Sequence, residues 1–146
     1  MSYEVTPLMR ENREKKFELY AKSFGNVASE FEIDVLETLY TMQNGDKIIY
    51  DEINDVFTTY TSSMFEGAND ILPMNVWTKE FSRKLKRTLL IRHMNQGELA
   101  AKIGVGQATI SNYIKGRSVP SSYIVRAMEK VLNLEPGYLS NFDYLL

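Results

Sequence analysis

The sequence predicts an all-α protein of two parts, an acidic helical domain over residues 1–75 and a five-helix domain over residues 76–146. Two observations support this prediction. Apolar residues recur at helical spacing in most segments of the chain. The charge also divides sharply, because residues 1–75 hold six Lys or Arg against 14 Asp or Glu, whereas residues 76–146 hold 11 against five. The net charges of the two parts are therefore −8 and +6.

Two helices are predicted at the start of the acidic part. The first covers residues 11–24 and ends at Gly25. The second begins near Ser29, because Ser29 and Glu32 have the spacing of a capping box. Apolar residues at helical spacing then continue it to about residue 43.

A third helix is predicted from residue 51 to Gly67, with its apolar residues on one face. Residues 48–50 are β-prone and are expected to form an extended connector or a small strand. Pro73 prevents continuation of a helix, so residues 71–75 are expected to join the two domains.

The basic part fits five helices. The first covers residues 77–93, and two short helices follow it. Ser121 or Ser122 caps a fourth helix, and Pro136 suits the first turn of a fifth.

The segment 95–116 is the most informative part of the chain. Two apolar stripes at helical spacing define its two short helices, namely Leu99, Ala100 and Ile103, then Ile110, Tyr113 and Ile114. Gly104 lies between them, where a steep corner requires a residue without a Cβ. This layout is that of a helix-turn-helix, whose second helix enters the major groove of DNA. Two helices around a glycine also occur in ordinary helical bundles.

The geometry of the second helix, residues 107–115, indicates which side chains contact bases. A helix that enters the groove presents its first turn to base edges, so Gln107, Ala108 and, one turn later, Asn112 are the candidates. Gln and Asn can form two hydrogen bonds with adenine, and an alanine methyl suits the thymine methyl. Phosphate or sugar contacts are expected from Thr109, Ser111, Lys115 and Arg117. Arg83, Lys84 and Arg87 are weaker candidates for the same role.

Residues 77–139 resemble the lambda-repressor/Cro, or XRE-type, helix-turn-helix family. The matching residues are Asn95-Gln96, Glu98-Leu99-Ala100, Gly104-Val105-Gly106-Gln107, Ile110-Ser111, Gly116 and Pro120. The resemblance implies that Gln96 binds phosphate and braces Gln107, with Asn95 capping the helix at the DNA backbone. Many members pair an arginine with a glutamate at the positions of Leu89 and Ile114, and two apolar residues can replace such a pair without loss of stability.

The apolar tail and the small size of one recognition helix together predict a homodimer. One helix contacts only a few base pairs, so a dimer on an inverted repeat is the expected way to gain specificity. Phe142, Tyr144, Leu145 and Leu146 are the candidates for the dimer contact. The alternative is that these residues fold back onto the N-terminal domain of the same chain.

Several functional classes are not supported by the composition. The chain has no cysteine and a single histidine, His93, so no nucleophile–base pair is evident and no enzyme activity, cofactor or metal is expected. The loop at Asn44-Gly45-Asp46 fits a calcium loop poorly, and Gly104-x-Gly106 is only a fragment of a dinucleotide-binding motif. The segment Met1-Ser2-Tyr3-Glu4 lacks a signal-peptide pattern, and no apolar run approaches the roughly 20 residues of a membrane span. A cytoplasmic protein with no membrane partner is therefore expected.

The predicted function is sequence-specific binding of double-stranded DNA by a transcriptional regulator. The resemblance adds the expectation of a phage or mobile-element repressor. The alternative is an antitoxin or a phage-encoded inhibitor. Such a protein would capture a basic protein partner with its acidic half and autoregulate through the helix-turn-helix.

Overall fold

The computed structural model describes residues 7–146, which divide into two units at the bond between Ala68 and Asn69. This boundary lies shortly before the segment 71–75 that was expected to join the domains. Residues 1–4, whose sequence lacks a signal-peptide pattern, lie outside the described residues.

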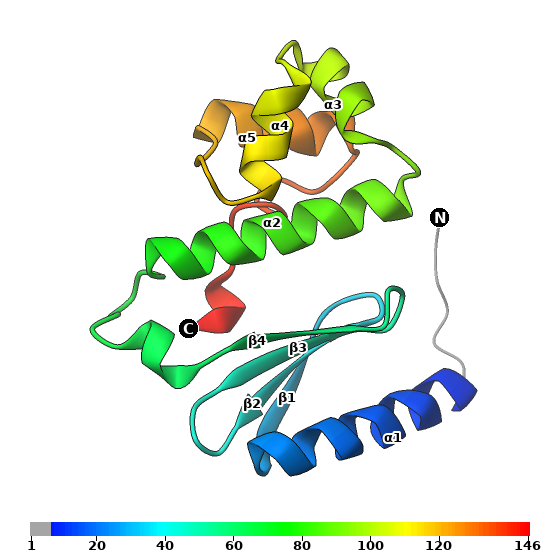
Figure 1. The fold of residues 1–146 in the computed structure, drawn as a ribbon, viewed down its shortest axis with the longest axis vertical. Coiled ribbons are helices and arrows are strands. Elements are labelled where there is room, and N and C mark those ends of the chain that lie inside the picture. The colour runs from blue at the N-terminus through cyan, green and yellow to red at the C-terminus, as the bar shows by residue number, and fades with distance from the viewer. Residues whose placement is uncertain (1–6) are drawn as a thin grey trace. The chain divides into compact units, whose positions relative to one another are not determined.

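The N-terminal unit combines one helix with an antiparallel sheet (Figure 1). Its elements are α1 (Pro7–Phe24), β1 (Val27–Asp34), β2 (Glu37–Met42), β3 (Lys47–Asp51), β4 (Val56–Tyr60) and the 3-10 helix η1 (Ser62–Phe65). The strands follow one another in the order β1-β2-β3-β4, and α1 lies along one face of the sheet. The predicted first helix is confirmed as α1, and the β-prone segment 48–50 forms β3. The all-α prediction is wrong, because strands replace the second and third predicted helices.

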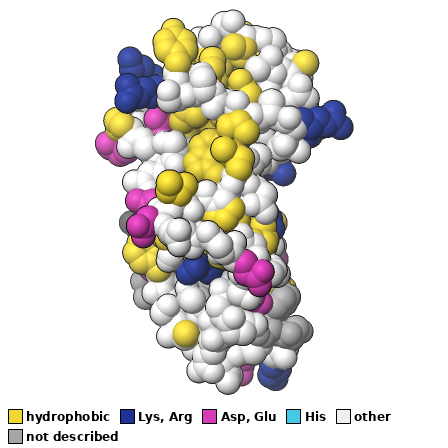
Figure 2. Space-filling model, turned by 90° about the vertical axis from the view of Figure 1, so that its left-hand side faces the viewer, with side chains coloured by type: hydrophobic (Ala, Val, Ile, Leu, Met, Phe, Trp, Pro, Cys, Tyr) yellow, Lys and Arg dark blue, Asp and Glu magenta, His cyan; other side chains and the backbone are white. Residues whose placement is uncertain are grey.

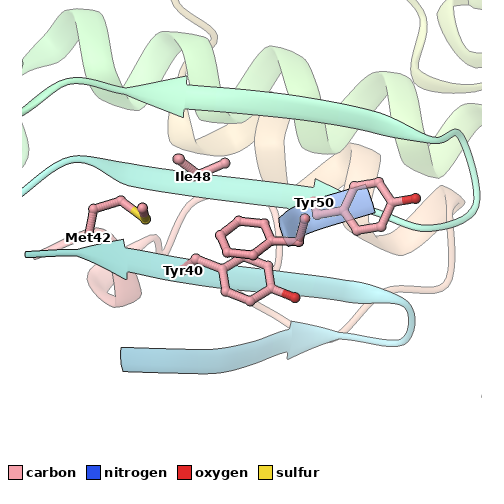
Figure 3. Packing of buried hydrophobic residues seen from close by; sticks show 5 residues of the cluster. Tyr40, Met42, Ile48 and Tyr50 are labelled. Carbon is pink, nitrogen blue, oxygen red and sulfur yellow. The ribbon is translucent and has the colours of Figure 1, made fainter. Parts of the chain in front are cut away.

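Aromatic packing joins α1 to this sheet. Phe17 of α1 and Tyr40, Met42, Ile48 and Tyr50 of the sheet form a buried cluster (Figure 3). The rings of Phe17 and Tyr40 stack with centroids 3.7 Å apart. In β2 and β3 the cluster members alternate along the chain, because successive side chains of a strand point to opposite faces.

The turns of the sheet explain why the predicted helices do not form. Leu36, between β1 and β2, has φ 58°, and Asp55, between β3 and β4, has φ 54°. A helix cannot pass through these left-handed residues. The side chain of Asp51 also accepts hydrogen bonds from the backbone N–H of Ile53, at 2.9 Å, and from the side chain of Asn54, at 2.7 Å. These bonds stabilise a turn that begins at Asp51.

The C-terminal unit is helical. Its elements are α2 (Met74–Ile91), α3 (Gln96–Ile103), α4 (Gln107–Ile114), α5 (Ser122–Val131) and the 3-10 helix η2 (Asp143–Leu145). Four of the five predicted helices are confirmed, and Ser121 is the N-cap of α5. Fully buried side chains of its core are Phe81, Leu85, Leu99, Ile110, Met128, Leu132 and Leu139.

The fifth predicted helix, from Pro136, is wrong. Gly137 has φ 91°, and residues 136–140 form successive turns. The backbone N–H of Leu139 donates to Oε2 of the buried Glu129 at 3.0 Å. This N–H therefore does not form a hydrogen bond within a helix. The segment is therefore held by a side chain of α5.

Candidate nucleic-acid interface

The corner between α3 and α4 is built as the sequence predicts. Gly104 ends α3 with φ 79°, and its N–H donates to the carbonyl of Ala100 at 2.9 Å. A Cβ built at Gly104 would meet nothing within 4 Å, so the backbone conformation, and not space, requires glycine there. Leu99, Ala100 and Ile110 are buried, so the two helices share a core on their inner sides.

A reciprocal capping box fixes the start of α3. Oδ1 of Asn95 accepts from the N–H of Glu98 at 2.8 Å, and the Glu98 carboxylate accepts from the N–H of Asn95 at 3.4 Å. The predicted capping role of Asn95 is confirmed. The reciprocal hydrogen bond to Glu98 was not predicted, although Glu98 lies three residues after Asn95, which is the spacing of a capping box.

The end of α4 is fixed from two directions. The N–H of Gly116 donates to Tyr113 at 3.1 Å, and that of Arg117 donates to Asn112 at 2.9 Å, which together form a Schellman motif. Gly116 has the positive φ, 72°, that this motif requires. The hydroxyl of Ser82 in α2 also donates to the carbonyl of Ile114. Sequence reasoning missed Ser82, because only the packing of α2 against α4 brings it there.

The predicted base-contacting residues lie at the start of α4. Gln107 and Ala108 are exposed, whereas Asn112, one turn later, is half-buried. Among the predicted backbone-contacting residues, Asn95, Lys115 and Arg117 are exposed, and Gln96, Thr109 and Ser111 are half-buried. The first turn of α4 is thus open to a ligand while both ends of the motif are held by capping interactions.

The Gln107 side chain lies against the start of α3. Its Oε1 is 3.3 Å from the position that a Cβ of Gly97 would occupy. The first turns of α3 and α4 therefore adjoin, as a joint role of Gln96 and Gln107 would require. Within residues 7–146, however, no hydrogen bond joins these two side chains.

The comparison with protein families agrees with this geometry. Residues 85–139 match a family model described as helix-turn-helix. These residues belong to the helix-turn-helix family. The match supports a DNA-binding regulator, and it does not extend into the sheet-containing N-terminal unit. Comparisons with curated proteins and with solved structures find no match.

The cations of the helix-turn-helix domain fall into two groups. Arg83 is bound to Glu80, with its Nε 2.5 Å from Oε1, and Nζ of Lys84 lies 3.8 Å above the ring of Tyr138. Arg87 is buried. The half-buried Arg92 belongs with them, because its Nε donates to the carbonyl of Leu132 at 3.0 Å. The exposed group contains Lys79, Lys86, Lys102, Lys115, Arg117, Arg126 and Lys130. In Figure 2, Lys and Arg side chains of the upper part lie at its edges, with hydrophobic side chains between them.

The apolar tail is largely internal. Phe142 is buried, and its ring centroid lies 5.7 Å from that of Trp77 in α2. Trp77 Nε1 donates to the carbonyl of Ser140 at 2.9 Å, and the Tyr144 hydroxyl donates to the buried carboxylate of Glu80. Leu145 is buried too, so of the four tail residues proposed for a dimer contact only Leu146 is exposed and Tyr144 half-exposed.

Other kinds of site find no support in the described part of the chain. Residues 7–146 contain no group of three His, Cys, Asp or Glu placed to hold a metal, and no helix there could cross a membrane. His93 is exposed in the turn after α2, with φ 52°. The loop at Asn44 is a turn between strands, so it does not resemble a calcium-binding helix-loop-helix.

Proposed function

We propose that this protein is a sequence-specific regulator of transcription that places α4 in the major groove of double-stranded DNA. The observation that supports this most directly is the exposed first turn of α4, with Gln107 and Ala108 presented outward and both ends of the motif capped. In this proposal Gln107 and Asn112 form hydrogen bonds with base edges, and the Ala108 methyl contacts a thymine methyl. The function is binding alone, with no catalytic step.

Phosphate contacts hold the motif in register on the duplex. Lys115 and Arg117 flank the glycine that ends α4, and both are exposed. Gln96 and Asn95 are at the N-terminus of α3, where backbone N–H groups and the helix dipole favour an anion. The net charge of +6 over residues 76–146 adds an attraction that does not depend on sequence.

We propose further that this protein binds an inverted repeat as a homodimer and acts as a repressor, as its resemblance to the lambda-repressor/Cro family implies. Because the tail leaves little exposed apolar surface, the contact between copies must involve other residues as well. Val119, 49% exposed, and Tyr123, 79% exposed, are apolar side chains of the helix-turn-helix domain that are available for it. Light scattering of the full chain, alone and on a duplex with two half-sites, tests this stoichiometry.

Two lysine variants and one glutamine variant test the DNA-binding role of α4. Lys115→Ala should weaken binding to all duplexes alike and reduce the slope of log K against log salt by about 0.9. Gln107→Ala should cost about 1–3 kcal/mol on the preferred duplex only. Lys22→Ala, which removes an exposed lysine from α1, is the matched control for charge. Equal effects of Lys22→Ala and Lys115→Ala in fluorescence anisotropy titrations would refute the assignment of Lys115.

A second candidate function is capture of a basic protein partner by the N-terminal unit, with autoregulation by the helix-turn-helix. The observation that favours it is the edge strand β1, where Glu30, Phe31 and Glu32 are all exposed. Because successive side chains of a strand point to opposite faces, Glu30 and Glu32 lie on one face of β1, where their carboxylates suit a basic surface, and Phe31 lies on the other face. Capture experiments with the full chain and with a Glu30→Lys, Glu32→Lys variant test it, since charge reversal should abolish the interaction.

A further inference from the structure

One glycine of the motif is explained neither by a positive φ nor by a capping position. Six of the eight glycines have positive φ, namely Gly25, Gly45, Gly67, Gly104, Gly116 and Gly137. Gly106 and Gly97 have no positive φ. Gly106 is the N-cap of α4, a position that suits glycine, whereas Gly97 is the second residue of α3. Glycine destabilises a helix relative to alanine. Another requirement must therefore account for glycine at this place.

The space beside Gly97 is occupied by the Gln107 side chain. A Cβ built at Gly97 would lie 3.3 Å from Oε1 and 3.7 Å from Cδ of Gln107. It would also lie 3.4 Å from Oδ1 of Asn95, which is an ordinary contact. The carboxamide of Gln107 thus packs against the backbone of α3, at a place where a Cβ would make it give way by a few tenths of an ångström.

We propose that Gly97 is a positioning residue for Gln107 and thereby a determinant of base preference. The inference rests on the proposed function, in which Gln107 contacts a base edge. A methyl group at position 97 forces the carboxamide to move by a few tenths of an ångström or to change rotamer. Because hydrogen bonds weaken steeply as their angles degrade, such a shift reduces discrimination at the base pair that Gln107 contacts.

A double-mutant cycle in the full chain separates this role from a merely structural one. Kd is measured by fluorescence anisotropy for a selected duplex and for duplexes changed at single base pairs. Gly97→Ala should reduce discrimination at one base pair about fivefold, the lower end of the loss of one base contact. In the Gln107→Ala background, Gly97→Ala should change no Kd ratio.

Stability provides an independent expectation for the same variant. Gly97→Ala should raise the Tm of the C-terminal unit by about 2–4 °C, since it removes a glycine from a helix. A protein that is more stable but less selective cannot owe its loss of selectivity to unfolding. If Gly97→Ala instead weakens all duplexes equally, and does so without Gln107 as well, the methyl meets the DNA itself and the proposal is overturned.

A measurement without DNA distinguishes the failure of this inference from that of the proposed function. The side-chain amide resonances of Gln107 should shift in Gly97→Ala, while those of Gln43, an exposed glutamine of the other unit, should not. Unchanged Gln107 resonances would contradict the positioning role. If they shift but Gln107→Ala leaves every Kd ratio unchanged, Gln107 does not contact a base, and the specificity role of Gly97 fails with it.

Discussion

Replacement of Phe142 tests whether the tail belongs to the core of the C-terminal unit. Phe142 is 1% exposed, and its ring lies 5.7 Å from Trp77 and 6.1 Å from Tyr144. Removal of a fully buried phenylalanine combines lost transfer free energy with a cavity, so Phe142→Ala should cost about 3–5 kcal/mol. In a unit of this size that loss lowers Tm by at least about 12 °C.

The assay can follow one unit alone, because Trp77 is the single tryptophan of the chain and contacts Phe142. Urea unfolding monitored by its fluorescence gives the free energy of unfolding of the C-terminal unit. Leu146→Ala, at a residue 47% exposed, is the control and should change this free energy by less than about 0.5 kcal/mol. A cost below about 1 kcal/mol for Phe142→Ala, with unchanged Trp77 emission, would refute the buried placement of the tail.

Three further predictions concern the turns and the N-terminal core. Gly104→Ala should destabilise the C-terminal unit by about 1–2 kcal/mol in urea unfolding, because φ 79° is unfavourable for a residue with a Cβ. An unchanged free energy of unfolding would contradict the requirement for glycine at this turn. Asn95→Ala should cost about 1 kcal/mol and Asn95→Ser much less in the same assay, since serine can still cap α3; equal losses would contradict the cap. Burial raises the pKa of the Tyr50 phenol above its usual value of 10.0, so the free energy of unfolding should fall as pH rises above 10. The unfolded chain releases this proton and the folded chain keeps it, which gives a slope of up to about 1.4 kcal/mol per pH unit. Tyr50→Phe should remove that slope, and an unchanged alkaline profile would contradict the burial.

The helix-turn-helix part was predictable because its signals are local. Helical spacing of Leu99 and Ile110, a glycine at the corner, and Asn and Ser caps at residues 95 and 121 all have a direct physical meaning in the sequence. The structure confirms each of them. What the sequence did not contain was the contact of Ser82 with α4, which depends on how α2 packs.

The sheet was not predicted because the spacing of its apolar residues is ambiguous. Phe31, Val35 and Leu39 are four residues apart, and that spacing fits one face of a helix as well as one face of a strand. Two of the three turns gave no glycine or proline signal, since Leu36 and Asp55 adopt positive φ themselves, and only the turn between β2 and β3 contains a glycine, Gly45 with φ 92°. The dense aromatic and β-branched residues between positions 38 and 60 were the signal that favours strands.

The tail was misjudged for a different reason. Phe142 lies beyond the predicted helices, so its apolar character suggested a surface for a partner. The structure shows that the turns after α5, held by Glu129, bring this segment back to Trp77 and Glu80 of α2. Contacts between residues more than 60 positions apart cannot be inferred from local periodicity. Removal of the residues after Ser140 would therefore remove part of the core of this unit.

Selection of bound duplexes from a random pool, with the full chain and with Gln107→Ala, tests most directly whether α4 contacts base edges. The wild-type protein should select two similar half-sites in inverted orientation, about one helical turn apart. Gln107→Ala should lose preference at one position of each half-site and keep the others. Identical selected sequences for the two proteins, or no enrichment at all, would contradict the central claim.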